Sequence, residues 1–95
     1  MSEELSDADR FLALVAAAQG RDSRLTSIQA GLLVAGEFGI ASDSRSFARI
    51  LGIAHSLVLR ELNALAEHEG VLEIVKRDAR TMRVHYEVPP RDETL

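Results

Sequence analysis

Residues 42–72, SDSRSFARILGIAHSLVLRELNALAEHEGVL, decide the fold of this chain. The stretch is typical of two helices joined by a tight turn. Asp43 can cap the first helix, because its carboxylate can accept the unpaired N–H groups of the opening turn. Gly52 is expected to end that helix, since only glycine takes a left-handed conformation at little cost. A second helix is expected from about His55 to His68.

Each expected helix carries an apolar stripe at helical spacing, which indicates that one side of it is buried. The stripes are Phe47, Ala48, Ile50 and Leu51 in the first helix, and Val58, Leu62, Leu65 and Ala66 in the second. A small residue, a glycine four positions later and a β-branched residue six positions after that form the helix-turn-helix pattern. In it Ala48 lets the helices approach closely, Gly52 makes the turn, and Val58 fills the space between them.

Further residues match a known protein family in order and nearly in spacing. They are Leu25, Thr26, Gln29, Leu32, Phe47, Ala48, Leu51 to Ile53, Ser56, Val58, Arg60, Leu65, Gly70 to Leu72 and the basic hairpin from Arg80 to Val84. From Leu25 to Val88 the chain resembles the DNA-binding core of MarR-type winged helix-turn-helix transcriptional regulators, without their C-terminal dimerisation helices. The resemblance implies an α+β fold of about four helices followed by a C-terminal β-hairpin, the wing. It also implies a bacterial regulator that binds specific sequences of double-stranded DNA.

Two helices and a short strand are expected ahead of the quoted stretch. The helices cover about residues 7–20 and 26–38. Thr26 and Gln29 form a capping-box arrangement at the start of the second of these helices. A short strand over residues 40–41 is expected to lie beside the later hairpin.

The expected hairpin has strands over residues 72–76 and 82–88. If Leu72 faces Tyr86 and Ile74 faces Val84, both strands present apolar residues on one side. A register shifted by one residue would mix the two faces, so the pattern favours this pairing. The pairing requires a loop with an odd number of residues around Ala79.

Length and composition indicate one soluble domain. We expect a single winged-helix domain over residues 1–95, with the segments 1–5 and 91–95 flexible. The absence of cysteine excludes disulfide scaffolds and cysteine-based metal sites. No apolar run reaches membrane-spanning length and no signal-peptide pattern opens the chain, so we expect a cytoplasmic protein with no membrane contact.

The helix expected from His55 holds the first candidate site. The resemblance implies that it enters the DNA major groove by its N-terminal end. The positions expected to face DNA are His55, Ser56, Leu57, Leu59 and Arg60, with Asn63 further along the helix. Arg60 is the best candidate for a guanine edge or a phosphate. Each residue also has an ordinary alternative: Arg60 can pair with a nearby acid, Ser56 can cap the helix, and His55 can be a plain surface residue.

The hairpin holds the second candidate site. The net charge of −4 does not indicate a nucleic-acid binder, but phosphate contact depends on the local patch. Arg80, near the tip, can enter a minor groove. The cations expected to contact phosphates are Lys76, Arg77 and Arg83 in the hairpin, and Arg45 and Arg49 in the preceding helix. The alternative is a solvated hairpin in which an arginine pairs with Asp78.

Two leucines leave a second function open. Leu57 and Leu59 occupy positions where the family commonly carries polar residues. They suggest altered specificity, or a winged-helix module that binds another protein and does not bind DNA specifically.

The chain lacks the family's C-terminal dimerisation helices, since it ends seven residues after Val88. We therefore expect a homodimer formed through the first helix, by Phe11, Leu12 and Val15. The same absence removes the family's usual ligand pocket, so no small-molecule effector is expected.

Catalysis finds little support in the sequence. His55, His68 and His85 are scattered, and the chain has no His-Glu-His spacing and no glycine-rich phosphate loop. We expect no enzyme activity, no catalytic residues, no metal and no cofactor.

Overall fold

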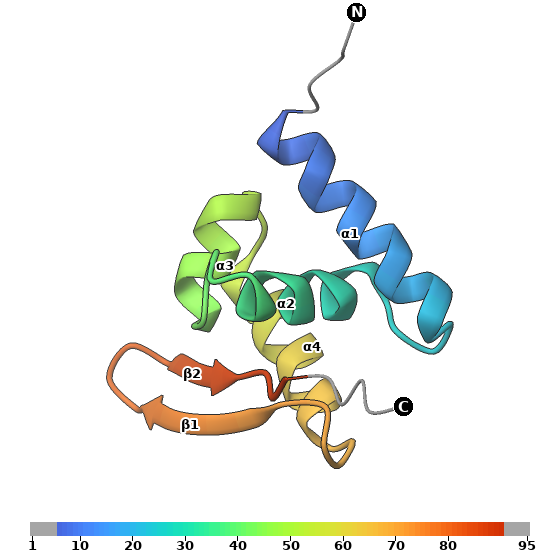
Figure 1. Cartoon of the computed structure of the whole chain (residues 1–95). Helices are drawn as coiled ribbons and strands as arrows, with labels where there is room; N and C mark the ends of the chain where they lie inside the picture. Colours follow the sequence, from blue (N-terminus) through green and yellow to red (C-terminus); the bar gives the residue numbers. More distant parts are fainter. Residues whose placement is uncertain (1–5, 91–95) are drawn as a thin grey trace, which may run out of the picture.

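Four helices and a C-terminal β-hairpin make up residues 6–90, the part of the chain that the computed structural model describes (Figure 1). The elements are α1 (Asp7–Arg21), α2 (Ser27–Glu37), α3 (Ser44–Leu51), α4 (His55–Ala66), β1 (Glu73–Asp78) and β2 (Arg83–Glu87). The predicted α+β class is confirmed, as is the order of four helices followed by a hairpin, and the arrangement is consistent with a winged-helix-like fold. The segments 1–5 and 91–95, predicted to be flexible, lie outside the described residues.

The helix boundaries follow from local capping chemistry. Thr26 and Gln29 form the predicted capping box, in which each side chain bonds the backbone N–H of the other at 3.1 Å. Asp43 caps α3 by accepting a 2.9 Å bond from the N–H of Ser46. Gly52 ends α3 in the left-handed conformation, with φ of 67°. The end of α4 differs from the prediction, because the helix stops at Ala66 and not at about residue 68.

The core lies where α2, α3, α4 and β2 meet. Its buried side chains are Leu32, Ala35, Ala41, Phe47, Ala48, Val58, Leu62, Leu65, Leu72, Val84 and Tyr86. Val58 is fully buried and Ala48 nearly so, as expected where two helices pack closely around a turn. The helix-turn-helix predicted from these positions is confirmed as a structural unit.

Tyr86 joins the hairpin to α2. Its hydroxyl donates a 2.7 Å hydrogen bond to the carbonyl oxygen of Leu32. Burial raises the pKa of this hydroxyl well above its usual value, so it stays protonated as a donor. Gly36 of α2 faces the same strand, and a Cβ there would meet Val88 Cγ2 at 2.7 Å. The helix and the strand therefore approach as closely as a glycine allows.

The predicted strand register is wrong. Ile74 pairs with Tyr86 and not with Val84, and Arg77 pairs with Val84. A β-bulge between Ile74 and Lys76 takes up one extra residue on β1. The loop between the paired residues 78 and 83 has four residues, an even number. Alternation of apolar residues could not reveal the bulge, because a bulge changes the pairing and leaves the composition unchanged.

The predicted short strand lies at a different place. The backbone N–H groups of Ile40 and Ala41 both bond to the carbonyl of Ala35, so they close the end of α2. Pairing with β2 begins one residue later. Ser42 accepts a 3.0 Å bond from the N–H of Tyr86, and a single bridge joins residues 43 and 85. No helix within the described residues is both long and apolar enough to cross a membrane.

Candidate nucleic-acid interface

The outward side of α4 carries a polar strip. Ser56, Arg60 and Asn63 are exposed, and their spacing of four and three residues places them on one side of the helix. The opposite side is fully buried in the core through Val58 and Leu62. The structure therefore brings together three of the predicted positions.

Arg60 is held only weakly by its neighbour. Its nitrogen lies 3.7 Å from an oxygen of Glu61, and the arginine side chain is 74% exposed. An ion pair this exposed contributes little free energy, because water and salt screen it. Glu61 also accepts a 3.2 Å hydrogen bond from the hydroxyl of Thr26. The acidic pairing considered as an alternative is thus present, and it leaves the guanidinium accessible.

The start of α4 has no side-chain cap. The N-cap position is Ala54, and Ser56 lies inside the first turn, so the alternative reading of Ser56 as the cap is wrong. The serine side chain points into solvent at the positive end of the helix dipole. This position suits a contact with an anion.

Leu57 and Leu59 flank the polar strip and are only half-buried. Leu59 packs against the core, which gives this apolar residue a structural role. Neither residue lies on the outward strip itself.

His55 has an inward partner. Its Nε2 lies 2.8 Å from Oγ of Ser44, and the imidazole is half-buried. Ser44 was not predicted to be a buried partner, although its spacing of three residues from Phe47 puts it on the buried side of α3. The pKa of His55 is lowered, first by burial and then by the charges of Arg45 and Arg83, against an opposing effect of Asp43.

Three of the predicted cations make contacts within the domain, and one of them reaches the polar strip. Arg77 of β1 donates a 3.3 Å hydrogen bond to Oδ1 of Asn63 on α4. From α3, Arg45 donates a 2.8 Å bond to the backbone carbonyl of Thr81 in the turn of the hairpin. Arg83 pairs with Asp43 at 3.3 Å. The remaining predicted cations, Arg49, Lys76 and Arg80, are exposed.

The internal pair considered for Asp78 takes another form. Its carboxylate accepts a 3.0 Å hydrogen bond from the backbone N–H of Arg80 and not from a guanidinium. This bond lowers the pKa of Asp78. The Asp78 carboxylate is therefore bonded to the backbone of the hairpin turn, and the Arg80 side chain remains exposed.

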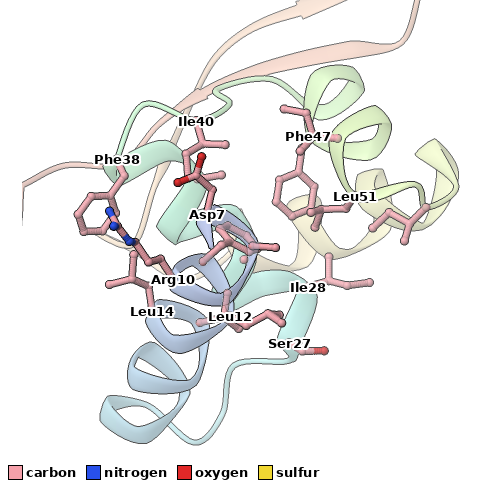
Figure 2. A pocket seen from close by; sticks show the side chains of 17 residues that line it. Asp7, Arg10, Leu12, Leu14, Ser27, Ile28, Phe38, Ile40, Phe47 and Leu51 are labelled. Atoms are coloured by element: carbon pink, nitrogen blue, oxygen red, sulfur yellow. The ribbon is translucent and has the colours of Figure 1, made fainter. Parts of the chain in front are cut away.

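An apolar groove lies on another part of the molecule, between α1, α2 and α3 (Figure 2). It has a volume of about 820 Å³, within the range of about 300–1,000 Å³ that is typical of small-molecule sites. Its exposed apolar side chains are Leu12, Phe38, Ile40, Ile50 and Leu51. The absence of a small-molecule effector therefore stays a prediction.

The residues predicted to form a dimer divide between two environments. Leu12 is 62% exposed, whereas Val15 is buried against α2 and cannot reach another chain. Phe11 is half-buried at the groove.

Comparisons of the chain with protein-family models, with curated proteins and with solved structures return no match.

Proposed function

We propose that this chain is a small, cytoplasmic, sequence-specific DNA-binding transcriptional regulator of the MarR-like winged-helix type. The outward strip of α4 would read the major groove, and the hairpin would contact the backbone and a minor groove. The observation that carries the proposal is the contact between Arg77 of the hairpin and Asn63 of α4, which joins a cationic strand to the strip that contains Arg60. A helix fits the major groove, which is about 12 Å wide, while neighbouring cations bind phosphates.

An unbiased selection of DNA duplexes at physiological salt tests this proposal. We expect one enriched motif, and an affinity that falls steeply as salt rises, because the protein displaces counterions from phosphates. Selection that enriches no motif above background would reject sequence-specific binding.

The proposal includes a second copy of the chain, bound along α1. Residues 11–18, FLALVAAA, contain no polar side chain, yet Leu12, Ala13, Ala16 and Ala17 lie exposed on the side away from α2. A monomer normally has polar residues on such a face. The helix has Asp7 and Asp9 in its first turn and Arg21 in its last turn. An antiparallel pair of α1 helices would therefore bring opposite charges together at both ends.

The alternative is a winged-helix module that binds a protein and not a specific DNA sequence. The half-buried Leu57, which flanks the polar strip, favours it. This alternative predicts that Leu57→Asp abolishes binding of a protein partner, while neutralising the hairpin arginines leaves that binding intact. A DNA regulator instead loses affinity for the duplex when the hairpin arginines are neutralised, since its phosphate contacts come from the hairpin.

A further inference from the structure

The hydroxyl group of Ser44 connects three elements of the fold. Its Oγ lies 2.8 Å from Nε2 of His55, the first residue of α4. The same oxygen accepts a 2.9 Å hydrogen bond from the backbone N–H of Val84 in β2. Ser44 itself is the first residue of α3 and is fully buried. One buried side chain therefore ties the start of α4 to the hairpin.

The bond from Val84 favours a neutral His55 whose Nε2 carries no hydrogen. Because Oγ accepts from Val84, the hydroxyl hydrogen of Ser44 is free to be donated, and Nε2 of a neutral imidazole is the acceptor beside it. An imidazolium would instead donate to Oγ. The hydroxyl hydrogen would then be buried without an acceptor among the described residues, which is unfavourable.

The charges around the imidazole also favour its neutral form. Burial is the first cause that lowers the pKa of His55, and the guanidinium groups of Arg45 on α3 and Arg83 on β2 add to it. Asp43 opposes them, but its carboxylate already pairs with Arg83 at 3.3 Å and caps α3.

We propose that His55 is a positioning residue: through Ser44 it holds the hairpin at a fixed place relative to α4, and it does so only while its imidazole is neutral. This inference rests on the proposed DNA-binding function, because fixed spacing matters where a helix and a hairpin must engage one duplex. Acid then loosens the connection and weakens DNA binding. A histidine that touched phosphate would have the opposite effect, since protonation would add a favourable charge.

Affinity for the selected duplex, measured from about pH 8 down to about pH 5, separates the two roles of His55. We expect the affinity of the wild-type protein to fall in acid. His55→Gln keeps an acceptor near the position of Nε2 and cannot take up a proton. It should therefore bind normally at neutral pH and lose the acid effect, whereas His55→Ala should bind about fivefold more weakly.

His68→Gln, which changes an exposed histidine beyond the end of α4, is the matched control and should follow the wild-type profile. Affinity that rises in acid in the wild type, together with weak neutral binding of His55→Gln, would overturn the positioning role in favour of direct contact.

Amide hydrogen exchange at Val84 tests the connection without DNA. Exchange should accelerate about fivefold in Ser44→Ala and in His55→Ala, and should stay near the wild-type rate in His55→Gln. If duplex selection finds no motif, the proposed function fails while this measurement still decides the connection. Equal exchange at Val84 in His55→Ala and the wild type would overturn it, even if Ser44→Ala did not fold.

Discussion

The Arg60 guanidinium extends into solvent beside the carboxylate of Glu61 at 3.7 Å. If it reads a base edge, Arg60→Ala should weaken binding to the selected duplex by about 1–3 kcal/mol and relax specificity at one position. Stability should change by less than about 0.5 kcal/mol, because the side chain is not part of the core. Titration of the selected duplex and of single-base variants measures both effects.

Arg24→Ala provides the control for this substitution. Arg24 is also exposed and also pairs with one acid, Asp22, but it lies in the loop between α1 and α2. If the Arg60→Ala and Arg24→Ala proteins bind with equal affinity and select the same DNA motif, Arg60 does not contact a base edge.

Asp43 makes stability depend on pH in the acid range. Burial would raise the pKa of its carboxyl, but the bond from the Ser46 N–H and the charge of Arg83 outweigh burial and lower the pKa. A lowered pKa stabilises the fold above the usual value of 3.8, and that contribution is lost as pH falls through the folded-state pKa. Asp43→Asn keeps the cap and removes the charge, so its melting temperature should fall less steeply in acid.

Melting temperatures of the Asp43→Asn and wild-type proteins, measured between about pH 7 and about pH 2.5, test this difference. Glu69→Gln, at an exposed site after α4, should leave the slope unchanged. Identical slopes for the Asp43→Asn and wild-type proteins would show that the charge of Asp43 does not stabilise the fold.

At the scale of the element, the close contact between α2 and the hairpin is expected to make alanine less stable than glycine at residue 36, the reverse of the usual order in a helix. Alanine usually stabilises a helix relative to glycine by about 1 kcal/mol. At Gly36 the new methyl group would overlap Val88 at 2.7 Å and Tyr86 at 3.0 Å, and overpacking costs about 1–3 kcal/mol. We expect Gly36→Ala to lower the free energy of unfolding, measured by denaturant titration.

Gly20→Ala is expected to change the free energy of unfolding in the opposite direction. Gly20 lies in the last turn of α1, and nothing lies within 4 Å of an added Cβ. This change should stabilise the protein modestly. A stabilising Gly36→Ala would mean that the strand can move away from the helix.

The sequence predicted those elements whose signals are local. The capping box at Thr26 and the left-handed turn at Gly52 depend on residues that are near neighbours in the chain, so their residue types suffice. The predicted hairpin register was wrong because it assumed regular alternation, which the bulge after Ile74 interrupts. The buried Ser44 was missed because its two partners lie 11 and 40 residues away in the chain.

At the scale of the whole molecule, α1 packs mainly on α2 and lies at the far end from the hairpin (Figure 1). If a second copy covers its outward face, Ala16→Arg should convert a dimer to a monomer in sedimentation equilibrium at micromolar concentration. The reason is that a charge would be placed in an apolar contact between two helices.

Ala64→Arg is the matched control, because Ala64 is also an exposed alanine on a helix, here on α4. A wild-type protein that stays monomeric at high micromolar concentration would reject the α1 dimer. It would also predict a single half-site, and not a palindrome, in the duplex selection.

The bulge in β1 has a consequence for solubility. Among the described residues, β2 is covered on one edge by β1 and is bridged on the other to residue 43, so the outer edge of β1 is the open edge of this sheet. An open edge is a template on which a foreign strand can add and start aggregation. The irregular spacing after Ile74 interrupts the row of donors and acceptors that such a strand would need. The β-bulge that made the predicted register wrong is therefore expected to hinder edge-to-edge polymerisation of the hairpin.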